Sequence, residues 1–220
     1  DASKISPTGR IPFIELNGER VADSHFILEH LMKVFKIDEQ LTSAQKAQGV
    51  AIRRILESSV NLHHMRWSMV DNMGVSLKVF GDAFFPRVPK VIAGKMLGSF
   101  RQKIITMLNS HGHGDLTDAQ FYSEYHSDIQ ALEHLLSLNN FAVGDVMTHV
   151  DVSVFNYLVV VRGFAAHVDE AQLPDAIRLA LKSKVLGDYY TRVEKKVFPD
   201  AQELIDQANK GDRWATVSRI

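Results

Sequence analysis

The sequence predicts an α+β protein, in which a short β-hairpin and one helix precede an all-helical domain. Two strand-like runs flank Asn17-Gly18, a pair typical of two-residue hairpin turns because both positions adopt positive φ. After Lys36 the apolar residues recur at helical spacing, and no further strand pattern appears. With the boundary at residues 36–42, the first part covers residues 1–36 and the helical domain residues 43–220.

The first part is predicted to run strand, turn, strand and helix. Residues 11–16 (IPFIEL) form the first strand-like run and residues 20–22 (RVA) the returning one. Asp23 or Ser24 then caps a helix, because either side chain can accept hydrogen bonds from the free N–H groups of a first turn. The apolar face of this helix is formed by Phe26, Ile27, His30, Leu31 and Val34.

The second part is predicted to be helical throughout. Gly74 and residues 81–89 are expected to interrupt the pattern after a long first helix, and Thr117 and Thr148 are expected to cap later ones. The predicted helices cover residues 43–73, 91–108, 118–138, 148–161, 173–185 and 186–197. The apolar positions of the first of them are Val50, Ile52, Ile55, Leu56, Val60 and Leu62.

Composition excludes several classes of function. The formal net charge is −1, so neither a nucleic-acid-binding surface nor a polybasic membrane-binding segment is indicated. The absence of cysteine excludes disulfides, thiolate nucleophiles and cysteine-based metal sites within these residues. No apolar run approaches the ~20 residues of a membrane span, and no phosphate-binding loop or dinucleotide fingerprint is present.

Pro12 stands inside an apolar, strand-like run, where its missing N–H removes one hydrogen bond of a sheet. One interpretation is a proline that simply begins a strand in the trans form. The other is a cis peptide bond that turns the backbone of Ile11 outward, where it can pair with an extended, peptide-like ligand.

Asp23-Ser24 also has two interpretations. The pair can be an ordinary helix cap, or the helix start can bind an anion, because its free N–H groups and dipole favour a carboxylate. A ligand with both an extended backbone and a free carboxylate would use Ile11 and Ser24 together.

The run TGRIPFIELNGERVADSHFILEHL resembles the second half of the thioredoxin-like domain of glutathione transferases. The resemblance implies that a cis-proline opens the third strand of that domain and that Ile11 and Pro12 hold the cysteinyl backbone of glutathione. It also implies that Asp23 and Ser24 hold the γ-glutamyl end. Arg10 is a weaker match, at a position where some classes place Gln or Lys near glutathione.

A second run, GDVMTHVDVSVFNYL, is similar to the start of a buried helix in the C-terminal domain of transferases. There a Ser/Thr-x-x-Asp capping box is expected, which Thr148 and Asp151 match, with a structural role. The runs RRILESSVNLHHMRW and HGHGDLTDAQFYSEYHSDIQALEHLL are similar to the failed-axon-connections and metaxin-like branch of the superfamily.

The start of the chain departs from the family. A complete thioredoxin-like domain needs on the order of 40–50 residues before the cis-proline strand, whereas only residues 1–7 are available for them here. The Tyr, Ser or Cys that activates the glutathione thiol in the family is therefore expected upstream of Asp1 or is lacking, and the catalytic residue is unknown.

Three side chains of the long first helix, His63, His64 and Trp67, are candidates for a substrate pocket. In transferases the corresponding helix lines the cleft that binds the electrophile; the alternative is a partly exposed helix face. His111 and His113 are an i, i+2 pair in a glycine-rich loop, which is only a weak metal-binding pattern, and no metal site is predicted.

The resemblance implies a glutathione transferase that uses glutathione as co-substrate and conjugates it to a small apolar electrophile. Glutathione-dependent isomerisation or dehalogenation on the same scaffold is a further reading. The alternative of another class is a non-catalytic interaction protein with the same fold. The family also implies a homodimer in the cytoplasm, and the mitochondrial surface only by analogy with the metaxins.

Overall fold

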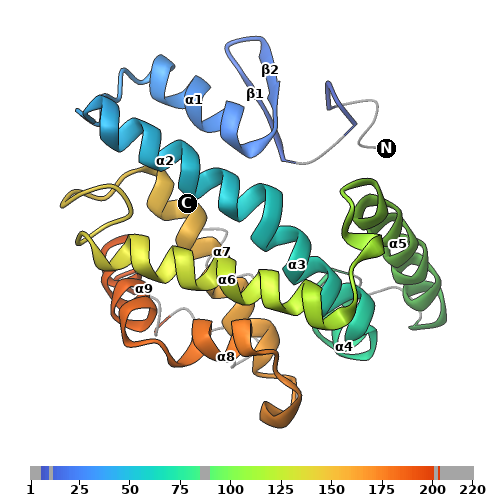
Figure 1. Cartoon of the computed structure of the whole chain (residues 1–220). Coiled ribbons are helices and arrows are strands. Elements are labelled where there is room, and N and C mark those ends of the chain that lie inside the picture. Colours follow the sequence, from blue (N-terminus) through green and yellow to red (C-terminus); the bar gives the residue numbers. More distant parts are fainter. Residues whose placement is uncertain (1–5, 10–11, 85–89, 201–202, 204–220) are drawn as a thin grey trace. The chain divides into compact units, whose positions relative to one another are not determined.

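The computed structural model describes residues 6–9, 12–84, 90–200 and 203 of the chain (Figure 1). The chain divides into two compact units, the N-terminal unit at residues 1–44 and the C-terminal unit at residues 45–220. A two-stranded antiparallel sheet precedes a series of helices. The predicted α+β class is therefore confirmed.

The N-terminal unit is built on the predicted hairpin. Strands β1 (Phe13–Leu16) and β2 (Glu19–Ala22) pair antiparallel, from Phe13 opposite Ala22 to Leu16 opposite Glu19. Asn17 and Gly18 both have positive φ, 53° and 83°, as a type I′ turn requires. The first strand begins one residue after Pro12, so the proline stands at the entrance of the strand.

Helix α1 (Ser24–Val34) follows directly, with Asp23 as its N-cap. Ile27 of its predicted apolar face is buried, but Phe26 is 58% exposed. The predicted face is therefore only partly covered among the described residues.

The helices of the C-terminal unit follow the predicted order, with small shifts at their ends. The α-helices are α2 (Ser43–Ile55), α3 (Asn61–Met65), α4 (Met73–Phe84), α5 (Lys90–Ser110), α6 (Asp118–Ser137), α7 (His149–Ala165), α8 (Asp175–Lys182) and α9 (Lys184–Val197). Two 3-10 turns, η4 (His113–Asp115) and η5 (Glu170–Gln172), connect some of them. Among the described residues, no helix combines the length and apolarity of a membrane span.

The long first helix contains two π-helical segments, η2 (Leu56–Val60) and η3 (Arg66–Asp71), on either side of α3. It ends at Asn72, whose φ of −119° and ψ of 42° leave the helical region. The break expected at Gly74 falls two residues earlier, at Asn72, and Gly74 itself lies within α4. Residues 81–84, also expected to interrupt the pattern, are helical, and residues 85–89 lie outside the described residues. Val50, expected on the apolar face, is 53% exposed.

Helix α6 contributes one buried stripe to the core, and α7 is buried along most of its length. Both pack against α8 and α9 (Figure 1). Gly49 lets α2 approach α7 closely, because a Cβ at this position would lie 3.0 Å from Cγ2 of Val150 in α7. The buried stripe of α6 consists of Phe121, Tyr125, Ile129, Leu132 and Leu136.

A buried carboxylate, that of Asp151, fixes the start of α7. The N–H of Thr148 donates to its Oδ2 at 2.8 Å, as the predicted capping box requires. The N–H of Ala142 and the hydroxyl of Tyr189 donate to its Oδ1, at 2.8 and 2.7 Å. The loop before α7, the helix itself and α9 therefore meet at one fully buried side chain.

Replacing this carboxylate should destabilise the protein strongly. We expect Asp151→Ala to lower the free energy of unfolding by about 3 kcal/mol, because buried donors lose a charged acceptor. The matched control is Asp188→Ala, whose exposed ion pair with Lys184 should contribute at most about 1 kcal/mol. Urea unfolding followed by circular dichroism measures both, and equal losses would contradict the assigned role of Asp151.

Candidate functional site

The hairpin brings Pro12 next to the start of α1. The N–H of Asp23 donates to the carbonyl oxygen of Pro12 at 3.2 Å, beyond the last strand pair, Phe13 and Ala22. The residue before the first strand is therefore held against the residue before the helix. Pro12 and Asp23 are two of the residues predicted from the sequence to contact the same ligand.

The backbone of Asp23 is strained. Its φ of 78° and ψ of 129° lie in a region that residues other than glycine rarely occupy. Such a conformation costs on the order of 1–3 kcal/mol and occurs preferentially at ligand sites. Its carboxylate accepts a hydrogen bond from the N–H of His25 at 3.0 Å. The sequence predicted the cap but gave no signal for the strain.

Ser24 is the exposed first residue of α1, and no acidic residue lies in the first turn. The helix start therefore offers N–H groups and a partial positive charge beside the carboxylate of Asp23. A group that combines an ammonium and a carboxylate would find complementary charges there. Arg10 and Ile11, the other two predicted contacts, lie outside the described residues.

The three candidates of the substrate pocket are all buried. His63, His64 and Trp67 are 0%, 6% and 1% exposed, so the alternative of a partly exposed helix face is wrong. They lie on α3 and η3, between or within the π-helical segments. Segments of this kind occur frequently at functional sites.

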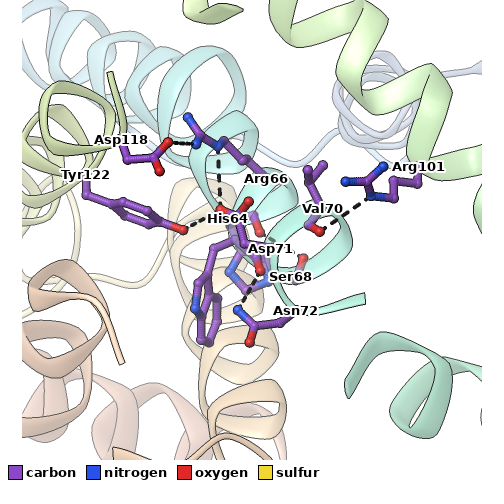
Figure 2. Close-up of polar contacts among 10 residues, drawn as sticks. His64, Arg66, Ser68, Val70, Asp71, Asn72, Arg101, Asp118 and Tyr122 are labelled. Atoms are coloured by element: carbon purple, nitrogen blue, oxygen red, sulfur yellow. Dashed lines mark hydrogen bonds and ion pairs between the residues drawn. The ribbon is translucent and has the colours of Figure 1, made fainter. Parts of the chain in front are cut away.

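Trp67 also lines a pocket of about 770 Å³ in the C-terminal unit, between η3, α6, η5 and α8. Figure 2 shows a polar network beside it: Arg66 pairs with Asp118, and its Nε lies 3.5 Å from Oδ2 of Asp71. The hydroxyl of Tyr122 donates to the same Oδ2 at 2.5 Å. Burial and this hydrogen bond raise the pKa of Tyr122, so the phenol stays protonated.

One group of side chains has the composition of a metal site. One ligand atom each of His63, His113 and Glu124 lie within 4.8 Å of one another. From the sequence, His113 was considered as a metal ligand only together with His111. His111 is exposed, and its Nδ1 lies 2.8 Å from the carbonyl oxygen of Met107. The carboxylate comes from α6, where Glu124 and Asp128 are four residues apart and share a face.

Comparison with known proteins points to one superfamily. A family model for the glutathione S-transferase N-terminal domain matches residues 1–73. The chain is 28% identical over 163 residues to isoprene-epoxide--glutathione S-transferase of Rhodococcus sp. (strain AD45), covering 70% of the chain and 66% of that protein. It is 27% identical over 208 residues to Failed axon connections of Drosophila melanogaster, covering 90% of the chain and 49% of that protein.

The chain thus spans about two thirds of the length of the first relative and about half of the second. No solved structure matches.

The burial of His64 should make stability depend on pH. Burial lowers its pKa to about 4, whereas the pKa of an unfolded histidine is about 6.5. Below pH 6.5 the unfolded chain therefore binds a proton that the folded chain does not. Stability should fall, by up to about 1.4 kcal/mol per pH unit, as the pH decreases from about 6.5 towards 4.

His64→Leu should remove this contribution and flatten the decrease, as measured by urea unfolding at several pH values. The control is His134→Leu, at an exposed position of α6, which should leave the slope unchanged. Parallel curves for the wild type and His64→Leu would show that His64 is not held neutral.

Proposed function

Because the chain belongs to the glutathione S-transferase superfamily, we propose that it binds glutathione in its N-terminal unit and conjugates it to a small apolar electrophile. The observation that carries the proposal is the contact between Asp23 and Pro12, which joins the strand entrance and a strained helix start in one place.

The γ-glutamyl end and the cysteinyl backbone of glutathione can each be matched to residues of the N-terminal unit. The γ-glutamyl end carries an ammonium and a carboxylate side by side. The exposed carboxylate of Asp23 would receive the ammonium, and the hydroxyl and N–H groups at Ser24 would receive the carboxylate. By the family resemblance, Ile11 and Pro12 would hold the cysteinyl backbone, with Arg10 close by.

The chemistry would be attack by the glutathione thiolate on an electrophilic carbon. A carbon–sulfur bond forms while the bond from that carbon to its leaving group breaks; in an epoxide, a ring carbon–oxygen bond breaks instead and the resulting alkoxide takes up a proton. The chain contains no cysteine, so the thiol comes from the ligand. The protein would lower the pKa of that thiol by hydrogen bonding to its thiolate form. This role is assigned to none of the residues present.

For the electrophile we retain Trp67 as the candidate contact, because it lines a described pocket that neither His63 nor His64 lines. The printed name of the bacterial relative makes an epoxide a suitable first substrate to test. A homodimer in the cytoplasm is proposed from the family resemblance alone.

Two substitutions test the glutathione site. We expect Ser24→Ala and Asp23→Ala each to weaken glutathione binding by roughly 10-fold to 100-fold, since each removes a charge-assisted hydrogen bond of about 1.5–3 kcal/mol. Isothermal titration calorimetry measures the dissociation constants.

Matched controls exist at two other helix starts. Ser43 is the exposed first residue of α2, and Asp169 accepts from the N–H two residues later at 3.0 Å, as Asp23 does. Ser43→Ala and Asp169→Ala should leave binding unchanged. If Ser24→Ala and Asp23→Ala behave like these controls, the proposed site is wrong.

A second function is a non-catalytic interaction protein with the same fold. It is favoured by the similarity to Failed axon connections, which extends over 90% of the chain. Turnover of glutathione with a chlorodinitrobenzene or an epoxide separates the two functions. Conjugation above the uncatalysed rate supports the enzyme, whereas glutathione binding without turnover supports the interaction protein.

A further inference from the structure

We propose that His63, His113 and Glu124 form a binding site for a divalent transition-metal ion such as Zn²⁺, with Asp128 orienting His63. The three residues come from α3, η4 and α6, all within the C-terminal unit. The proposal concerns a site separate from the residues assigned to glutathione and does not depend on them.

The distances suit a small metal ion. One ligand atom from each of the three residues lies within 4.8 Å of the other two. Zn²⁺ binds nitrogen and oxygen at about 2.0–2.2 Å, so tetrahedral ligands lie roughly 3.3–3.5 Å apart. Small side-chain rotations, most easily of the exposed Glu124, would bring the atoms to that separation. The two histidine rings lie edge to face, with centroids 5.1 Å apart.

The imidazole of His63 is buried without hydrogen bonds. The side chain is fully buried, and neither ring nitrogen makes a hydrogen bond, although the carboxylate of Asp128 lies beside Nδ1. Nδ1 of His113 is also buried without a hydrogen-bond partner. Buried polar atoms are nearly always paired, and an unpaired one often marks the place of a water or an ion. A metal ion would accept a lone pair from each histidine.

The surroundings of His63 direct one nitrogen to the proposed ion. Nδ1 faces Oδ2 of Asp128 at 3.3 Å, and Nε2 faces Oε2 of Glu124 at 4.0 Å. Asp128 is itself held by the hydroxyl of Ser59, which donates to Oδ2 at 2.6 Å. A carboxylate beside one imidazole nitrogen keeps the proton there and leaves the other nitrogen free to bind metal, as in many zinc sites.

The glycine-rich loop holds His113 inward. Gly112 adopts a φ of 81°, which favours glycine. At Gly114 a Cβ would lie 2.3 Å from Oδ1 of Asn109, so the loop is closed tightly against the end of α5. His113 is therefore placed against His63 and the ring of Phe121, 5.5 Å between centroids.

The ligand set selects the kind of metal. Two imidazoles and one carboxylate suit Zn²⁺ and related transition metals, and leave a fourth position for water. Mg²⁺ and Ca²⁺ prefer sites made of oxygen atoms alone. Mg²⁺ is therefore a suitable negative control.

The test uses the tag-free full chain after treatment with a chelator, in the absence of glutathione. Zn²⁺ is titrated in competition with a chromophoric chelator, and thermal unfolding is followed with Zn²⁺ and with Mg²⁺. We expect a single Zn²⁺ per chain and a higher Tm with Zn²⁺ only. Asp128→Asn should weaken Zn²⁺ binding by roughly 10-fold to 100-fold.

His113→Ala and Glu124→Gln should abolish this binding. Glu124 is exposed and His113 partly buried, and circular dichroism checks that both variants fold. The matched control is His111→Ala, two residues from His113 and exposed, which should bind Zn²⁺ like the wild type. The proposal is overturned if the wild type binds no Zn²⁺, or if His113→Ala and Glu124→Gln bind it as tightly as His111→Ala. Neither outcome bears on glutathione binding.

Discussion

The helical architecture of the C-terminal unit depends on one buried charge, the carboxylate of Asp151. A buried carboxylate is costly unless it is hydrogen-bonded, and here each of its oxygens accepts hydrogen bonds from the backbone and a hydroxyl group. The donors come from the loop before α7, from the N-cap of α7 and from α9. The start of the most buried helix is thus fixed in direction, and α8 and α9 pack against a helix whose position is already determined.

The features that the sequence predicted are local ones. Asn17-Gly18 selects its turn by backbone preference alone. The predicted cap at Thr117 and the predicted capping box at Thr148 each involve a residue only three positions later. The long helix ends two residues before the predicted end for a related reason. Glycine suggested a break, but the helix ends at Asn72, whose side-chain amide donates to the carbonyl oxygen of Trp67 at 2.9 Å. A polar side chain that donates a hydrogen bond to a nearby backbone carbonyl can end a helix just as a glycine can.

The features that were not predicted from the sequence are contacts between residues far apart in the chain. His63 and Glu124 are separated by two helices, and only the packing of α6 beside α3 brings them together. The same packing buries His63 and His64, whose spacing alone was equally compatible with an exposed face. At Asp23 the missing information is conformational, because aspartate is a common helix cap and its residue type does not indicate the positive φ that the structure shows.

The two π-helical segments have a consequence for comparing this protein with its relatives. In each of them a backbone N–H bonds to the carbonyl five residues earlier, as from Asn61 to Leu56 and from Asn72 to Trp67. Such a turn holds one more residue than an α-turn. Homologues that lack either segment would align only with a one-residue gap within residues 56–60 or 66–71. A helical wheel drawn with a constant period across this stretch would therefore misplace the residues that follow each segment.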